Sequence, residues 1–295
     1  MKKYFKVLLL IAVITAGSFS PASATEYLLG LRGGYFVWDP WLKDLHPQFD
    51  QMGKGTGSLY GPVASVLLTD DLSISVSGLF GNQRGGDLSE GIYREEDGTT
   101  QDLKFSFDIF RMDIDGVINY RLGDNFKIFA GYKYWYMKTD YNAIEYRYDA
   151  ANTLVHVYRD DMTITQPFNG PAAGLGFSLP IGAKGYFVAA NVSGLYLWGK
   201  FKYDSKPRVS IEGPLWAYNT EDAGEAETDM KMYGVNIEPT IGVNPGEGYP
   251  IFTVGVRYQY NKLKIVDAPP ELQDMNQDWM TDKIYGMFVG VLYQI

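Results

Sequence analysis

Several stretches of the chain alternate between apolar and polar residues. In Leu72–Phe80 (LSISVSGLF) one set of alternate positions is apolar or Gly, and the other set is mostly Ser. Phe252–Tyr260 (FTVGVRYQY) and Phe110–Tyr120 show the same alternation. Successive side chains of a β-strand point to opposite faces, so each stretch has one apolar and one polar face. The pattern predicts an all-β chain.

Ten such stretches are joined by connections that alternate between short and long. Short turns on one side and long loops on the other are typical of a membrane-spanning barrel, whereas a soluble β-sandwich has no reason to separate loop lengths in this way. We expect strands near 26–38, 58–69, 71–81, 103–121, 125–140, 167–179, 184–202, 229–244, 250–265 and 282–295, with long polar connections at 39–57, 82–102, 141–166, 203–228 and 266–281.

The strand count has two alternatives, eight and twelve. Within the connection 141–166, the segments IEYRYD and TLVHVYR resemble a hairpin that extends its neighbouring strands above the membrane. Insertion of that hairpin would give twelve strands, and eight would require dropping a hairpin that alternates well. Pro167 and Pro171 make 167–179 the weakest expected strand, because proline donates no hydrogen bond to a β-ladder.

The apolar faces are expected to meet lipid rather than a protein core. They end in tyrosines, as interfacial girdles do, and the polar faces are rich in Gly, Ser, Asn and charges. Beyond the N-terminal segment there is no run of about 18 apolar residues, and only helices or closed barrels satisfy the backbone in lipid. The prediction is a closed antiparallel up-and-down transmembrane β-barrel, with girdle residues Tyr120, Tyr258, Tyr260 and Tyr293.

Residues 1–24 have the pattern of a cleavable secretory signal. Three lysines precede the apolar run VLLLIAVITAG, and the small residues Ala22-Ser23-Ala24 follow it. Residues 25–295 are then a single barrel domain. The composition agrees with this, because 33 glycines and 23 tyrosines suit turns and interfacial belts. Without cysteine, with two histidines and with a net charge of −9, we expect no metal or cofactor site and no nucleic-acid partner.

Charged residues on the polar faces are the nearest approach to a site. We expect Asp113 opposite Lys133 and Glu238 near Arg257, each across a short turn. The favoured interpretation is that paired charges fill the lumen of a barrel of this size; the alternative is a narrow pore lined by the same charges. The expected lumen charges are Arg32, Arg111, Asp113, Asp115, Lys133, Glu238 and Arg257.

We expect no catalytic residues. Asp113 and Asp115 form an Asp-x-Asp pair in mid-strand, but His46 and His156 both fall in outer loops, as does Asp44. A catalytic group needs its nucleophile, acid and base within mutual reach. The loops are acidic, which favours a solvated surface over a site for divalent cations or a partner, and no segment has the spacing of a calcium loop.

The segment RMDIDGVINYRLGDNFKIFAGYKYWYMKTDY and the closing strand KIYGMFVGVLYQI resemble Gram-negative outer-membrane β-barrels of the OmpA/OmpX-like and porin type. The resemblance implies an outer-membrane location, contact with its lipid, and recognition of the last strand by the assembly machinery, although the terminal residue is Ile295 rather than Phe. The omptin proteases, which are also ten-stranded, use an Asp pair with an Asp-His pair; we do not carry that activity over.

The sequence thus predicts a non-enzymatic outer-membrane barrel with a structural or surface-interaction role and a lumen filled by paired charges. An extracellular partner would meet its loops. The alternatives are a narrow, porin-like channel for ions or small solutes, and a surface hydrolase of the omptin or lipid A-modifying type.

Overall fold

The computed structural model describes residues 26–44, 53–94, 100–149, 151–182, 184–210, 224–266 and 278–295. The expected signal at 1–24 lies outside these ranges, as does His46. The elements, in chain order, are β1 (Tyr27–Asp39), the 3-10 helix η1 (Trp41–Asp44), β2 (Gly55–Leu67), β3 (Leu72–Arg94), β4 (Thr100–Leu122), β5 (Phe126–Tyr148), β6 (Leu154–Ile181), β7 (Tyr186–Ser210), β8 (Gly224–Val243), β9 (Ile251–Val266) and β10 (Met280–Gln294).

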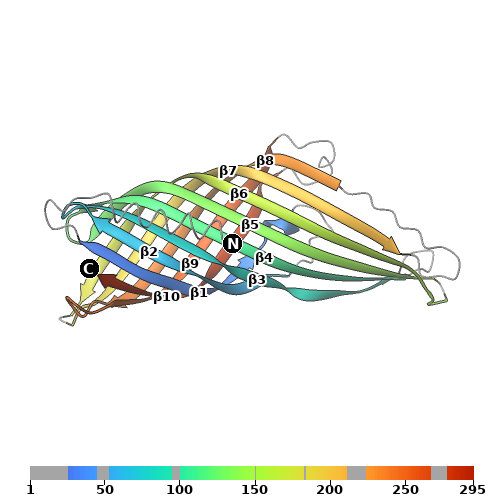
Figure 1. Ribbon diagram of the computed structural model, residues 1–295, viewed down its shortest axis with the longest axis horizontal. Helices are drawn as coiled ribbons and strands as arrows, with labels where there is room; N and C mark the ends of the chain where they lie inside the picture. Colours follow the sequence, from blue (N-terminus) through green and yellow to red (C-terminus); the bar gives the residue numbers. More distant parts are fainter. Residues whose placement is uncertain are drawn as a thin grey trace.

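The ten strands form a closed ring in which each strand pairs with its neighbours in sequence (Figure 1). β1 closes the ring by pairing antiparallel with β10 as well as with β2. The predicted closed antiparallel up-and-down barrel of ten strands is therefore confirmed, and the alternatives of eight and twelve strands are wrong.

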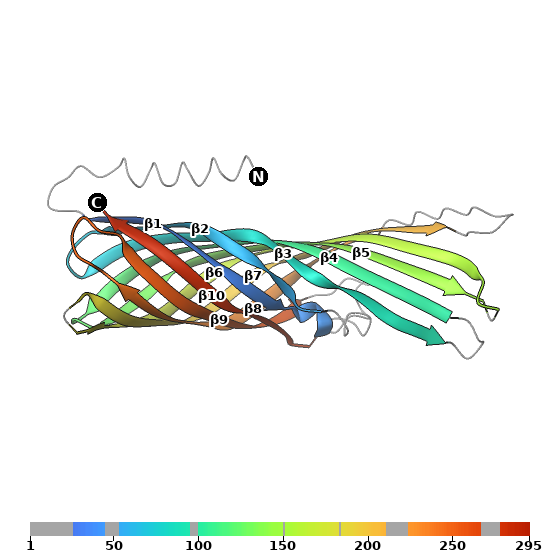
Figure 2. The same ribbon diagram turned by 90° about the horizontal axis from the view of Figure 1, so that it is seen from below.

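β3 to β8 are longer than expected and project beyond the other strands on the side of the long connections (Figure 2). The connection expected at 82–102 contains the end of β3 and the start of β4, and that at 203–228 contains the end of β7 and the start of β8. The segments flanking 149–153 pair as an extension of β5 and β6, as predicted, and the turn between them holds Asn152 at φ 63°. These segments carry charged residues beside apolar ones such as Val155 and Val157, so their sequence predicts a hairpin outside the membrane rather than membrane-spanning strands.

β6 runs unbroken through both of its prolines for 28 residues. Its ladder to β5 is continuous there, but the ladder to β7 skips Pro167 and Pro171. Proline has no N–H to donate to a neighbouring strand. Because the two prolines are four residues apart and the strand period is two, both lack this donor on the side of the same neighbouring strand. Asn169 lies between them and donates a side-chain hydrogen bond of 3.4 Å to the carbonyl of Trp198 on β7.

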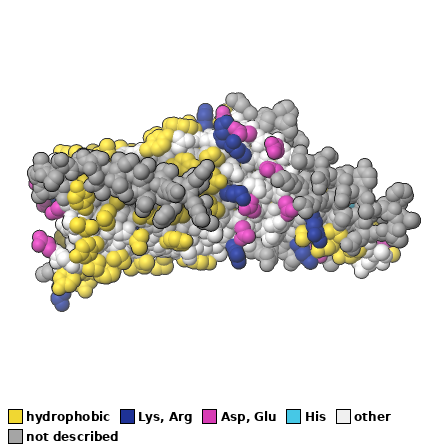
Figure 3. Space-filling view, in the orientation of Figure 1, with side chains coloured by type: hydrophobic (Ala, Val, Ile, Leu, Met, Phe, Trp, Pro, Cys, Tyr) yellow, Lys and Arg dark blue, Asp and Glu magenta, His cyan; other side chains and the backbone are white. Residues whose placement is uncertain are grey.

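The outer surface carries the apolar faces, as predicted. Ile118 and Tyr120 on β4 are 55% and 47% exposed, whereas Arg111 and Asp113 on the opposite face are 0% and 1% exposed. Figure 3 shows the apolar side chains gathered over the barrel, on the side of the short turns. So large an exposed apolar area is stable only in lipid. The strand residues that are most exposed, at 62% to 67%, are Leu31, Tyr60, Leu175, Ile241 and Met287.

The apolar core lies inside the barrel, toward the side of the long connections. Its side chains come from β1 and β4 to β10, and η1 contributes Trp41 and Leu42. We call this set the apolar layer; its other members are Trp38, Phe107, Ile109, Trp135, Met137, Tyr141, Met162, Ile164, Phe168, Leu195, Leu197, Phe201, Met230, Met232, Leu263, Ile265 and Met280. The prediction of a lumen filled by charges did not include such a layer.

Candidate functional site: the interior charge network

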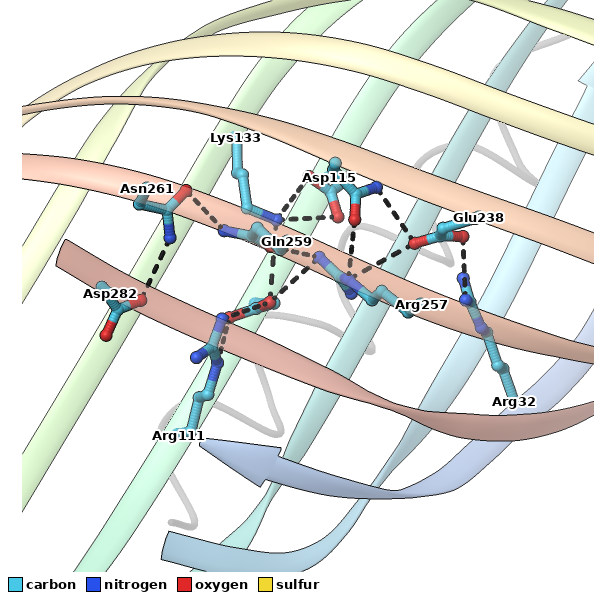
Figure 4. A network of polar contacts seen from close by, with 11 residues as sticks. Arg32, Arg111, Asp115, Lys133, Glu238, Arg257, Gln259, Asn261 and Asp282 are labelled. Atoms are coloured by element: carbon cyan, nitrogen blue, oxygen red, sulfur yellow. Dashed lines mark hydrogen bonds and ion pairs between the residues drawn. The ribbon is translucent and has the colours of Figure 1, made fainter. Parts of the chain in front are cut away.

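The seven charges expected in the lumen lie in one connected network across five strands (Figure 4). Arg32 comes from β1, Glu238 from β8 and Arg257 from β9, and the other four come from β4 and β5. Each is on the inward face of its strand, because the outward positions are taken by the apolar belt. The network is the seven residues Arg32, Arg111, Asp113, Asp115, Lys133, Glu238 and Arg257.

Asp113 is at the centre of the network and contacts three cations. Its carboxylate accepts hydrogen bonds from Arg111 at 3.0 and 3.2 Å, and from Arg257 of β9 at 3.3 Å. The ammonium of Lys133 lies 3.7 Å from it. All four side chains are at most 4% exposed. Since an unpaired buried charge is very costly, this arrangement makes each charge dependent on the others.

The cross-strand partner of Lys133 is Asp115 rather than Asp113. The β4–β5 register pairs their Cα positions directly, and Lys133 donates to Asp115 at 2.9 Å. The sequence-based pairing of Lys133 with Asp113 is thus two residues out of register, although a flexible lysine reaches both. Gly123, at φ 72°, lies in the turn that sets this register.

Glu238 joins the two remaining arginines. It accepts a hydrogen bond from Arg32 at 2.8 Å and lies 3.4 Å from Arg257. The guanidinium of Arg32 also lies over the ring of Phe288, at 3.5 Å from its centroid. Glu238 and Arg257 are therefore close together, as expected. Arg32 reaches the same carboxylate from β1, across the seam where β1 pairs with β10.

Four further residues extend the network toward the apolar layer and were missed from the sequence. Arg257 donates to Gln259 at 2.9 Å, and Gln259 donates to Asn261 at 3.2 Å. Asn261 and the indole N–H of Trp38 then donate to the two oxygens of Asp282, at 3.1 and 2.5 Å. The alternation marks Gln259 and Asn261 as inward, but no local signal pairs Trp38 with a residue of the last strand.

The apolar layer closes the barrel above this network. Arg111 lies 5.2 Å from the ring of Trp135, which packs on Phe168 at 5.0 Å between ring centroids. The helix η1 covers the layer by inserting Trp41 and Leu42, both fully buried. Asp44 holds η1 in place by accepting a 2.7 Å hydrogen bond from the backbone N–H of Thr281.

Two open cavities lie on the other side of the network, toward the short turns. The outer one has a volume of about 520 Å³, and the one next to the network about 190 Å³. Both are lined by Ser75, Asn119, Lys127 and Asn191, so they form one vestibule that ends at the network. The lumen is therefore hollow on one side and filled on the other.

Some buried polar atoms around the apolar layer have no hydrogen-bond partner in the described part of the chain. They include both side-chain polar atoms of Gln166, the hydroxyl of Thr139 and one terminal nitrogen of Arg111. Gln166 is opposite Met137, and Thr139 is opposite Ile164, so these groups lie side by side on β5 and β6. Buried amides without partners cost free energy, which makes this patch a weak point of the interior.

The residues considered for catalysis do not come together as far as the structure describes them. His156 is on the projecting part of β6, opposite Arg147, and no hydrogen bond joins it to a carboxylate among the described residues. Asp44 begins an Asp-Leu-His sequence ending at His46, which lies outside the described ranges. The apolar layer separates Asp44 from Asp113 and Asp115. The described ranges contain no group of three or more His, Cys, Asp or Glu placed to hold a metal ion.

The projecting strands have ion pairs of their own. Glu227 on β8 accepts hydrogen bonds from Lys200 and Lys202 on β7. These two ammonium groups lower the pKa of Glu227 to about 2. Lys138 and Asp140 on β5 form another such pair, at 2.6 Å.

No protein-family model and no curated protein sequence matches the chain. Among solved structures it is similar to the outer-membrane protease OmpT of Escherichia coli, with 10% identity, 95% of this chain and 99% of that chain covered, and a TM-score of 0.45. It is also similar to the translocator domain of the autotransporter NalP of Neisseria meningitidis, with 10% identity, 99% of this chain and 96% of that chain covered, and a TM-score of 0.38. For the outer-membrane protein OprG of Pseudomonas aeruginosa the identity is 11%, the coverage is 92% of this chain and 96% of that chain, and the TM-score is 0.30. No residue role is transferred from these structures.

The closed ring and the exposed apolar belt identify the chain as an outer-membrane β-barrel in contact with lipid. Among the described residues no helix is long and apolar enough to cross a membrane.

Proposed function

We propose that the protein is a closed, non-enzymatic outer-membrane barrel that holds a tall extracellular sheet for interaction at the cell surface. The observation that supports this most is the double closure of the lumen. The charge network spans the interior from β1 to β9, and the apolar layer with η1 covers it. Conduction would require both to move.

Opening the network would be costly. Separating a buried charge from its partner costs about 3–5 kcal/mol, and Asp113 alone joins three cations. The apolar layer adds a second barrier, since a dry apolar constriction excludes hydrated ions. A permanently closed lumen therefore fits these contacts better than a pore that opens spontaneously.

The projecting sheet supports the surface-interaction part of the proposal. β6 has 28 residues and β1 has 13, so β6 has about 50 Å more strand at about 3.3 Å per residue. A barrel that only spans the bilayer needs about 9–11 residues per strand. The extra length carries polar side chains and ion pairs into the external solvent, where a partner would bind them. On the opposite side, we propose that the assembly machinery recognises β10.

Planar-bilayer recording of the purified protein tests the closed-lumen proposal. We expect no discrete conductance steps for the wild-type chain. Deleting Trp41–Asp44 together with Arg111→Ala should produce steps, because it weakens both barriers: the apolar layer loses the residues of η1, and Asp113 loses one of its three cations. Discrete steps in the wild-type protein that change with Asp113→Asn would refute the proposal.

A narrow channel is the second candidate, and the vestibule favours it. The cavities of about 520 and 190 Å³ lead polar solutes from the short-turn side up to Arg32 and Lys133. In that case the network would be a selectivity filter rather than a plug. Anion-to-cation permeability ratios measured in the same recordings would then shift on Lys133→Gln, whereas a closed barrel would show no current to analyse.

A further inference from the structure

Four lysines gather on the outward face of β8, β9 and β10, just above the apolar belt. Lys231 is on β8, Lys262 and Lys264 are on β9, and Lys283 is on β10. Each occupies an outward position, since the residues beside it (Met230, Met232, Leu263 and Ile284) are buried inside the barrel. We call these four residues the lysine cluster.

The pairing register forces the positive charges together. Lys231 lies directly opposite Lys264 across the β8–β9 ladder, a position in which side chains of opposite strands approach to about 5 Å. Lys262 and Lys283 each place their ammonium 6.0 Å from the centroid of the Tyr260 ring. Like charges in direct cross-strand register destabilise a sheet unless an anion lies between them.

Within the described ranges, no carboxylate forms an ion pair with the lysine cluster. Lys262 donates a 2.8 Å hydrogen bond to the hydroxyl of Thr281, which is neutral. Asp39 faces Lys283 across the β1–β10 ladder but is paired with Lys43 at 2.9 Å. Asp229 lies further out on β8, opposite Lys200. The neighbouring lysines at 200 and 202 behave differently, because they share Glu227. The chain is acidic, with a net charge of −9, so an excess of basic residues does not explain why these lysines lack ion pairs.

The depth of the lysine cluster corresponds to the lipid headgroups. Tyr233 is two residues below Lys231 on the same face, is 45% exposed, and packs edge-on against Trp279 at 4.8 Å. Below it, Val235 and Tyr258 continue the exposed apolar belt at 43% and 41%. Tyr and Trp mark the boundary between hydrocarbon and headgroup, so Lys231 and Lys264, two residues further out than the Tyr233–Lys262 pair, lie among phosphates. Lys262 and Lys283 are level with Tyr233 and Tyr260 in the strand register, and long lysine side chains reach the headgroups from such positions. Lys and Arg side chains likewise border the apolar belt on the face shown in Figure 3.

We propose that the lysine cluster is a binding site for the phosphate groups of an outer-leaflet lipid. The phosphate would lie between Lys231 and Lys264, with Lys262 and Lys283 beside it, and the acyl chains would lie along the belt formed by Tyr233, Val235 and Tyr258. A lipid fits better than a free anion because the apolar belt is continuous with the cationic site. The site is independent of whether the lumen conducts.

The test compares lipid binding to the full-length protein in neutral detergent by native mass spectrometry. The probe is diphosphoryl lipid A, and Lys231→Gln with Lys264→Gln is the test variant. At about fivefold per lysine near a lipid surface, the double variant should bind about 25-fold more weakly. The control is Lys104→Gln with Lys138→Gln, which removes the same charge from lysines that have their own carboxylates, Asp102 and Asp140.

Each outcome decides the proposal. Weakened binding in the test variant, with unchanged binding in the control and unchanged heat-modifiable gel mobility in both, supports the lipid site. Equal binding by wild type and test variant, or equal loss in the control, overturns it. Inorganic phosphate that displaces the lipid A at matched phosphate concentration would assign the site to a free anion and also overturn the lipid assignment.

Discussion

Replacing Asp113 by Asn tests whether the charge network holds the barrel together. The seven-residue network has four cations and three carboxylates, a balance of +1, and the substitution raises this to +2 in a buried setting. Arg111 loses its only carboxylate partner in the network, while Arg257 and Lys133 keep Glu238 and Asp115. Removing one partner of a buried ion pair costs about 3–5 kcal/mol, so we expect a loss of this size in the free energy of unfolding.

The assay is urea unfolding in detergent or lipid, followed by tryptophan fluorescence. Trp135 is a suitable reporter because it is fully buried beside Arg111. Asp108→Asn is the matched control: it lies on the same strand, and its pair with Arg84 is exposed at 69% and 85%. Exposed pairs contribute about 0–1 kcal/mol, so the control should change little. A loss below about 1 kcal/mol for Asp113→Asn, equal to the control, would refute the reasoning.

Three further outcomes follow from the structure. Gln166→Met should raise the free energy of unfolding by about 1–3 kcal/mol, because it removes two buried polar atoms without partners; a destabilised variant in the same urea assay would show that Gln166 has a partner. Trp41→Ala should lower the free energy of unfolding by about 3–5 kcal/mol, because Trp41 is fully buried and packs on Phe201. An unchanged urea midpoint would show that η1 is not part of the core. Glu227 should stay ionised in NMR titration to about pH 2, below its ordinary pKa of 4.5. Its folded pKa is depressed, so its stabilising effect is complete above pH 4.5 and is lost as the pH falls through 2; titration near pH 4.5 would contradict the pairing with Lys200 and Lys202.

The membrane-spanning part of the fold was predictable because its two faces differ chemically. In β4 the alternation of Ile118 and Tyr120 with Arg111 and Asp113 identifies both the strand and the side that meets lipid. Beyond the apolar belt, outward positions of these strands carry charged side chains such as Asp108 and Lys138, while inward residues such as Phe107 and Met162 stay buried. The apolar outer face that marks a membrane-spanning strand is therefore missing there. The strand ends there, such as Leu154 at the start of β6, are set by pairing to neighbours rather than by hydropathy.

The interior was predictable only where its chemistry contrasts with the outer face. Arg257 stands out between Val256 and Tyr258, but the segment around Trp135 reads Tyr-Trp-Tyr-Met, with apolar residues on both faces. Such a segment does not reveal which residues fill the lumen, so the apolar layer was missed. The contact of Trp38 with Asp282 joins residues 244 apart, and only closure of the ring brings them together.

The seam between β1 and β10 has a consequence for how the barrel is made. The backbones of Tyr27 and Ile295 exchange two hydrogen bonds across it, at 3.2 and 2.8 Å. The interior contacts of Trp38 with Asp282, and of Arg32 with Glu238, depend on the same closure. Until the first and last strands meet, these groups stay hydrated and the sheet keeps two open edges. The pairing of β10 with β1 thus decides when the interior dries, and contacts between residues so distant in the sequence form slowly.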